Sequence, residues 1–182
     1  MTLDRLEETK LVEAAQTGDI DAFESLVRAH SSAVYAHAMR FFGEKQAAED
    51  VLQEVFIKVY RSLAGFNGQS AFSTWLFRVT RTTCLDMLRS AKKRPLPVDP
   101  VDMLALVEAD HAPGVIEAVT LEEAMRALSP EDREALSAVT LFGMNYVEAA
   151  DALNVPVGTV KSRVFRARRT LLSVLGLTKD RS

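Results

Sequence analysis

Residues 154–175 read NVPVGTVKSRVFRARRTLLSVL, and this stretch decides the fold of the C-terminal half. Apolar side chains recur at spacings of three and four residues, which places them on one stripe of an α-helix; they are Val157, Val160, Val164, Ala167 and Leu171. The opposite face and its edges are polar and basic, and they carry Gly158, Lys161, Ser162, Arg163, Phe165, Arg166, Arg168 and Arg169. A helix with one apolar stripe and a basic opposite face is suited to lie against DNA phosphates and to reach base edges. A solvated basic surface would give the same pattern.

The residues just before this helix favour the DNA-binding interpretation. Asn145 and Glu148 form a capping pair, which predicts a short helix that ends at Leu153. Asn154 and Val155 then supply a tight turn into the basic helix. A short helix, a brief turn and a basic second helix predict a helix-turn-helix. Upstream, Ser129 with Pro130 at the first position predicts another helix over 130–142.

The composition indicates an all-α protein of one medium domain or two small ones. The chain has 182 residues, 48% of them hydrophobic, and helix formers dominate while alternating strand-like runs are absent. A single cysteine, Cys84, excludes an internal disulfide and fits a reducing compartment. The N-terminus lacks a signal-peptide pattern, and no apolar run reaches membrane-spanning length. We therefore expect a cytoplasmic protein without membrane insertion.

The net charge of −3 hides an uneven distribution. Residues 95–125 contain no Lys or Arg but carry seven acids, which are Asp99, Asp102, Glu108, Asp110, Glu117, Glu122 and Glu123. Pro95, Pro97 and Pro100 break the preceding helix, and Pro113 with Gly114 closes the segment. The pattern predicts an acidic linker between two cationic halves. Helix resumes at about residue 115 and continues to about residue 128.

The N-terminal half is predicted to hold four helices, over about 6–15, 21–42, 45–63 and 71–91, with Asp21 and Ser70 as caps. The third helix has a broad apolar face that includes Tyr60, and the other side carries Asp50, Gln53 and Glu54. We interpret these polar residues as either a solvated face or a docking face for a protein. His30 and His37 are seven residues apart, too far for two ligands of one metal ion, so we expect core or surface roles.

The fourth helix carries a second cationic face, with Arg78, Arg81, Arg89 and Lys92 on one side. A polar loop with an aromatic residue, over 64–70, precedes it. Aromatic rings beside cations suit single-stranded DNA, whose bases stack while the backbone meets Arg and Lys. The rings of Phe72 and Trp75 fit a core role better than a base-stacking role.

Three blocks together resemble the extracytoplasmic-function (ECF) sigma factors of RNA polymerase: AEDVLQEVF at 48–56, FSTWLFRV at 72–79 and PVGTVKSR at 156–163. The resemblance implies two small helical domains, domain 2 over 1–94 and domain 4 over 115–182, joined by the acidic linker over 95–114. It implies no enzyme activity and no cofactor. The partners that it implies are promoter DNA, core polymerase through the β′ clamp helices and the β flap, and an anti-sigma factor.

The resemblance also assigns roles to individual positions. The docking face for core polymerase would be Asp50, Gln53 and Glu54. The minus-ten element, read on the non-template strand, would meet Phe66, Asn67, Gln69, Ser70, Arg78, Arg81 and Thr82. The minus-thirty-five duplex would meet Lys161, Ser162, Phe165 and Arg166 at base edges, and Thr159, Arg163 and Arg169 at phosphates. Phe165 suits contact with a thymine methyl group.

Two other functions compete with the sigma-factor interpretation. A stand-alone helix-turn-helix regulator with an N-terminal sensing or dimerisation domain explains the C-terminal half, but it leaves the 48–56 block and the basic fourth helix unexplained. A helical enzyme or metal-dependent hydrolase lacks ligand spacing, a nucleophile with a base, and a Gly-rich phosphate loop, so no catalytic and no metal-binding residues are predicted.

Overall fold

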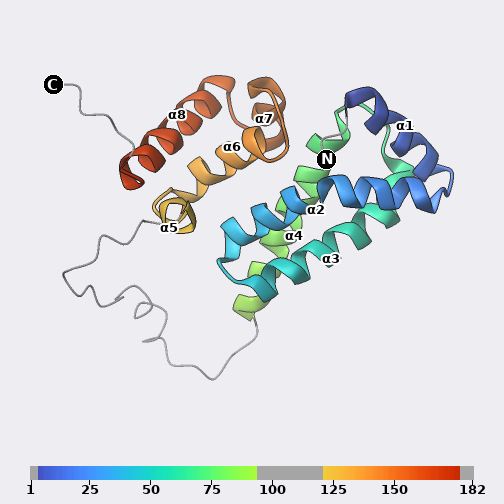
Figure 1. Ribbon diagram of the computed structural model, residues 1–182, viewed down its shortest axis with the longest axis horizontal. Helices are drawn as coiled ribbons and strands as arrows, with labels where there is room; N and C mark the ends of the chain where they lie inside the picture. Colours follow the sequence, from blue (N-terminus) through green and yellow to red (C-terminus); the bar gives the residue numbers. More distant parts are fainter. Residues whose placement is uncertain (1–3, 94–120, 177–182) are drawn as a thin grey trace.

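The computed structural model describes residues 4–93 and 121–176, and within these ranges the chain forms helices and no strands. The N-terminal half comprises α1 (Arg5–Gln16), α2 (Ile20–Phe42), α3 (Lys45–Ser62), the short 3₁₀ turn η1 (Leu63–Gly65) and α4 (Phe72–Lys93). The C-terminal half comprises α5 (Leu121–Arg126), α6 (Pro130–Thr140), α7 (Tyr146–Leu153) and α8 (Val157–Val174) (Figure 1). The predicted all-α class is confirmed. The predicted linker over 95–114, and the part of the following helix over 115–120, lie outside the described residues.

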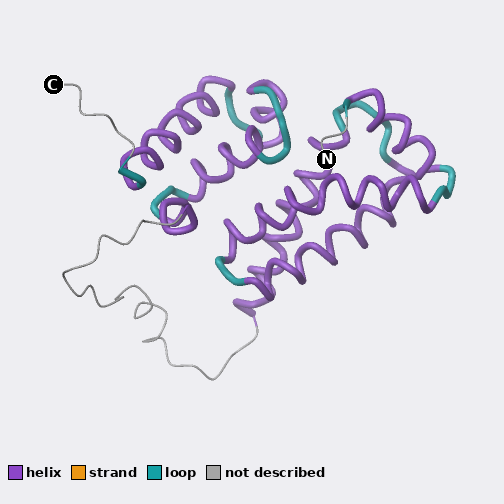
Figure 2. The backbone as a smooth tube through the Cα atoms, viewed as in Figure 1, coloured by secondary structure: helices purple, strands orange, loops and turns teal. Residues whose placement is uncertain are grey.

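Helices α2, α3 and α4 pack as a bundle, and α1 lies against α2 (Figures 1 and 2). Their apolar stripes meet in a core in which the side chains of Leu26, Val34, Val55, Leu76 and Phe77 are fully buried. Burial of each such side chain contributes about 1.5–3 kcal/mol relative to an exposed position. The amphipathic spacing that predicted these helices therefore also supplies most of the force that holds them together.

Two predicted helix caps are wrong, and both errors have a local cause. The helix that was expected to begin at Asp21 begins at Ile20, because the side chain of Asp19 accepts a hydrogen bond of 3.0 Å from the amide of Ala22. The hydroxyl of Ser70 lies 3.3 Å from the carbonyl of Ala71 and caps no amide, so α4 begins at Phe72. The predicted end of this helix at residue 42 is confirmed, and the left-handed backbone of Gly43, φ 72°, terminates it.

The C-terminal half contains the predicted helix-turn-helix. Asn145 accepts hydrogen bonds from the amides of Val147 and Glu148, both at 2.9 Å, and the Glu148 carboxylate accepts in return from the amide of Asn145 at 3.0 Å. This capping box starts α7 at the predicted place. Asn154 ends α7 in the left-handed region, φ 54°, which Asn tolerates better than most residues. The turn then leads directly into α8, which packs on α5, α6 and α7.

The two halves pack against each other, which the sequence did not predict. Helix α2 contacts α5 and α6, and α4 contacts α7. At the centre of this junction the buried ring of His37 lies 5.4 Å from the ring of Phe77 and 5.9 Å from that of Phe142. Nearby, the guanidinium of Arg133 donates a 2.7 Å hydrogen bond to the carbonyl of Arg40. The described residues of the two halves therefore share one continuous core.

Candidate nucleic-acid interface

The outer face of α8 is open to solvent and combines cations, hydroxyls and one ring. Val160, Val164 and Ala167 are buried, as the apolar stripe predicts. The opposite side exposes Lys161, Ser162, Phe165, Arg166 and Arg169, while Thr159 and Arg163 are half-buried at its edges. Phe165 is 67% exposed, which is unusual for a ring on a polar face. A rigid helix that presents these groups can enter a DNA major groove and meet both phosphates and base edges.

On this face of α8, the guanidinium of Arg166 is paired with the carboxylate of Asp132. Its Nη2 lies 2.7 Å from Oδ1 of Asp132, and its Nε lies 3.1 Å from Oδ2 of the same residue. This bidentate pair raises the pKa of Arg166, so the guanidinium stays charged. Asp132 is buried in the first turn of α6, where the N-terminal amides favour a carboxylate. The pairing was not predicted, because Asp132 and Arg166 are 34 positions apart in the sequence.

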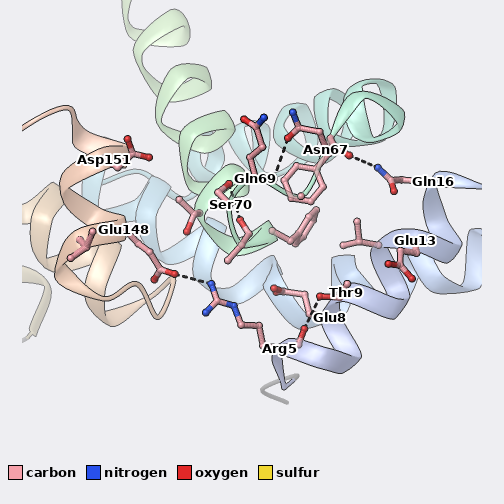
Figure 3. A pocket seen from close by; sticks show the side chains of 17 residues that line it. Arg5, Glu8, Thr9, Glu13, Gln16, Asn67, Gln69, Ser70, Glu148 and Asp151 are labelled. Atoms are coloured by element: carbon pink, nitrogen blue, oxygen red, sulfur yellow. Dashed lines mark hydrogen bonds and ion pairs between the residues drawn. The ribbon is translucent and has the colours of Figure 1, made fainter.

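The loop before α4 borders a hollow of about 630 Å³ that α1 and α7 also line (Figure 3). The side chains of Asn67 and Gln69 are exposed, and that of Ser70 is half-buried. Phe66 is half-buried because its ring packs 5.1 Å from the ring of Trp75. The loop is held at its base by Gln16, whose amide donates to the carbonyls of Leu63 and Phe66 at 2.9 and 2.6 Å. The walls of the hollow offer amides and hydroxyls that can hydrogen-bond the edge of a base.

Arg78 and Arg81 of α4 are not open to solvent as the predicted basic face implied, whereas Arg89 of the same face is exposed. Arg78 makes an ion pair with Asp151 of α7, and Nε of Arg81 lies 2.9 Å from Oε1 of Glu134 of α6. Thr82 is exposed beside them. Both pairs join the N-terminal half to the C-terminal half, so the guanidinium groups face carboxylates in this arrangement.

The polar face of α3 is exposed at Asp50 and Gln53 and half-exposed at Glu54. Glu54 lies 3.7 Å from Lys58, one turn along the helix. The exposed rim also carries two apolar side chains, Ile57 at 45% and Tyr60 at 62% exposure. The prediction had placed Tyr60 on the buried face, but its ring meets only the edge of the core, at 5.1 Å from Phe23. Gln53, Ile57 and Tyr60 are spaced four and three residues apart, which places them on one face of α3. This spacing was the sequence signal that the side chains of Ile57 and Tyr60 share the exposed face.

Outside these surfaces, the described cysteine and the described acidic and histidine side chains form no reactive or metal-binding site. Burial raises the pKa of the Cys84 thiol to about 12, and the charge of Glu134 adds to the shift, so the thiol stays protonated. Among the described residues, no group of three or more His, Cys, Asp or Glu side chains is arranged to hold a metal ion. A search of the same residues finds no helix that is long and apolar enough to cross a membrane.

Comparison with known proteins now decides the family. Residues 26–94 match the family described as Sigma-70 region 2, and residues 118–171 match Sigma-70, region 4. The chain is 36% identical to the RNA polymerase sigma-H factor of Pseudomonas aeruginosa, over 91% of this chain and 92% of that protein. It is also 36% identical to the ECF RNA polymerase sigma-E factor of Escherichia coli K12, over 92% and 94% of the two chains. The chain belongs to the ECF sigma factors.

Solved structures show the same fold. This sigma factor superposes with a TM-score of 0.67 on CnrH in complex with the cytosolic domain of CnrY, at 24% identity over 95% of this chain and 99% of that chain. It superposes equally well on the sigma factor RpoE of Bartonella quintana in complex with the anti-sigma factor NepR, at 23% identity over 88% and 100% of the chains. The family matches, not the shared fold, make the protein a sigma factor of RNA polymerase, a transcription initiation factor, and the stand-alone regulator is set aside.

Proposed function

We propose that this sigma factor uses its helical surfaces for three separate steps of promoter recognition. Domain 4, over 115–182, binds the minus-thirty-five duplex through α8, and domain 2, over 1–94, binds core polymerase through α3. The loop before α4, with α4 itself, captures the non-template strand at the minus-ten element once the duplex opens. The linker over 95–114 connects the two domains inside the polymerase. The protein acts in the cytoplasm, where it meets both polymerase and promoter.

The observation that carries this proposal is the exposed face of α8 on a rigid helix-turn-helix. Lys161 and Ser162 lie one turn before Phe165, so cation, hydroxyl and ring meet the same few base pairs. Thr159, Arg163 and Arg169 flank them and contact phosphates on either side. Arg166 reaches a base edge from a fixed orientation, because Asp132 holds its guanidinium.

On the N-terminal half, the minus-ten strand meets Phe66, Asn67, Gln69 and Ser70 in the loop, and Arg78, Arg81 and Thr82 on α4. The half-buried position of Phe66 supports a role in shaping the loop, with Asn67 and Gln69 as the groups that meet a base. The contact with core polymerase uses Asp50, Gln53 and Glu54 against the β′ clamp helices, where the carboxylates of Asp50 and Glu54 suit basic partner residues. Domain 4 meets the β flap.

We further propose that an anti-sigma factor regulates this protein. The support is the structure of the Bartonella quintana sigma factor in complex with its anti-sigma factor, which shares the fold of this chain.

Transcription from native promoters by core polymerase, with and without the protein, tests the proposal. A genomic promoter library should give specific start sites only when the protein is present. Phe165→Ala should then lose the preference of the complex for thymine over uracil at one position of the minus-thirty-five element, because the two bases differ by the methyl group alone. Ile20→Ala is the matched control, since Ile20 is 64% exposed in the other half. An unchanged thymine preference in Phe165→Ala would contradict the role given to α8.

A further inference from the structure

The side chain of Gln16, at the end of α1, makes two hydrogen bonds that join α1 to the loop before α4. Its amide nitrogen donates to the carbonyl of Leu63 at 2.9 Å and to that of Phe66 at 2.6 Å. Figure 3 shows Gln16 reaching from α1 toward the part of the loop that carries Asn67. Helix α1 precedes residues 26–94, which match Sigma-70 region 2, so that match assigns no role to Gln16.

We infer that Gln16 is a positioning residue for strand capture, because it fixes the orientation in which the loop presents Asn67 and Gln69 to a base. The inference rests on the proposed function of this loop. Gln16 acts through the shape of the loop and makes no contact with DNA itself. Helix α1 thereby contributes to capture of the minus-ten strand, although none of its residues was assigned a role there.

The first step of this positioning runs through one peptide group. The carbonyl of Phe66 and the amide of Asn67 belong to the same planar unit, which rotates as one body. A donor that holds the carbonyl therefore also sets the direction in which the chain enters Asn67. The carbonyl of Leu63 accepts from Gln16 and also, at 3.0 Å, from the amide of Phe66. The Gln16 amide thus holds both ends of the turn over 63–66.

The second step runs from Asn67 to Gln69. The side-chain oxygen of Asn67 accepts a hydrogen bond of 3.2 Å from the amide of Gln69. Between them Gly68 has φ 71°, in the left-handed region that a glycine adopts without a steric penalty. An orientation that is set at Phe66 is therefore passed through Asn67 to the backbone of Gln69, and both polar side chains depend on it.

The backbone that carries Gln16 is itself well fixed. The amides of Thr17 and Gly18 donate to carbonyls in the last turn of α1, both at 3.1 Å. Val12 of α1 and Leu26 of α2 are buried in the same core. A group that sits on a rigid element holds its partner more precisely than a group on a loop. Gln16 therefore provides the loop with a stationary donor.

The ring of Phe66 has a separate attachment that does not involve Gln16. It lies 5.1 Å from the ring of Trp75 and 6.1 Å from that of Phe72. Loss of the Gln16 amide would leave this ring in place, while the peptide group after Phe66 gains freedom. A loop that is ordered before binding loses less conformational entropy when it binds. Removal of the amide should therefore weaken base capture without unfolding the protein.

The test uses Gln16→Leu, which removes both donors, and Thr9→Val as its control. Thr9 lies earlier on α1 and lines the same hollow, but its hydroxyl donates to the carbonyl of Arg5 at 2.9 Å and not to the loop. Each protein is assembled with core polymerase. The probes are fork-junction DNAs from a promoter found in the genomic library, with a single non-template strand over the minus-ten element. Each base of that strand is either intact or replaced, one at a time, by an abasic site.

We expect Gln16→Leu to bind the intact probe about tenfold more weakly than the wild type, because the loop loses two hydrogen bonds. It should bind the probe that lacks the captured base as the wild type does, since that probe offers only backbone contacts. Thr9→Val should resemble the wild type with both probes. Gln16→Glu, which sets a carboxylate against two carbonyls, should lose at least as much affinity as Gln16→Leu.

A second measurement needs no DNA and uses the free full-length chain. The NMR order parameters of the backbone amides of Asn67 and Gln69 should fall from about 0.85 in the wild type to below about 0.6 in Gln16→Leu. The order parameter of Trp75, in the first turns of α4, should not change. Circular dichroism spectra of the two proteins should coincide, which shows that the helices are intact.

Three results would overturn the inference: unchanged order parameters in Gln16→Leu, an equal loss of affinity in Thr9→Val, or a loss of the same size on the probe that lacks the captured base. If the wild-type complex binds intact and abasic probes alike, the proposed function of the loop fails first. If the wild type distinguishes the probes and Gln16→Leu distinguishes them equally well, the inference alone fails.

Discussion

Acidification should destabilise this protein through one buried side chain, His37. The ring is 2% exposed and lies among Phe41, Phe77 and Phe142 at centroid distances of 6.4, 5.4 and 5.9 Å. Neither ring nitrogen has a hydrogen-bond partner in the described protein. Burial, followed by the charges of Arg40 and Arg81, lowers the pKa of His37 from 6.5 to about 4. The charge of Glu134 on the facing helix is paired with Arg81 and does not compensate.

The sign of the effect follows from the direction of this shift. The packed protein holds His37 neutral, whereas the unfolded chain protonates it below about pH 6.5, so the unfolded state binds more protons as pH falls. The stability that the neutral ring contributes is present above pH 6.5 and is lost between pH 6.5 and 4. At 1.36 kcal/mol per pKa unit, the full shift corresponds to about 3 kcal/mol, of which about 2 kcal/mol is lost between pH 7.5 and 5.

The assay is urea unfolding of the wild type and His37→Leu at pH 7.5 and pH 5. Leu has a volume close to that of His and carries no polar nitrogen, so the variant should unfold at pH 7.5 with a free energy within about 1.5 kcal/mol of the wild type. The other titrating groups are shared, so the difference between the two proteins isolates His37. We expect the wild type to lose about 2 kcal/mol more than His37→Leu on acidification. An equal loss in both proteins would refute the assignment of a depressed pKa to this ring.

Two further predictions concern a helix cap and the docking face. Asn145→Ala should lower the free energy of unfolding by about 1 kcal/mol, because two amides lose their acceptor; Ser70→Ala should change it little, because that hydroxyl caps no amide. Glu54→Lys should impair assembly with core polymerase in a pull-down while leaving the circular dichroism spectrum unchanged. Glu24→Lys is its control, since Glu24 also pairs with a cation one turn along its own helix. Equal assembly of the two Lys variants would show that the α3 face is merely solvated.

The helices could be predicted from the sequence because their signals are local. The spacing of Val160, Val164 and Ala167, and the pair Asn145 and Glu148, lie within one or two helical turns. The errors were also local: Asp19 and Asp21 are both plausible caps, and only the hydrogen bond to Ala22 distinguishes them. Local patterns thus located the helices and their apolar stripes, with uncertainty of one or two residues at the ends.

The candidate interface was harder to predict because its decisive contacts are distant in sequence. The pairs of Arg78 with Asp151 and of Arg81 with Glu134 span 73 and 53 residues. A basic helix face has the same sequence whether its arginines are free or paired with carboxylates. The sequence alone therefore did not reveal these ion pairs. His37 showed the same limit, since a histidine on a helix stripe fits a core or a surface until the opposing ring of Phe142 is known.

Arg133 joins the turn between α5 and α6 to the end of α2 through one guanidinium. Its guanidinium donates to the carbonyls of Arg126 and Leu128 within its own half, at 3.4 and 3.0 Å, and to the carbonyl of Arg40 across the junction at 2.7 Å. When the halves part, only the last of these bonds is lost, and the other two keep the side chain in place. The turn between α5 and α6 therefore keeps two hydrogen bonds to Arg133 that do not depend on the contact with the N-terminal half.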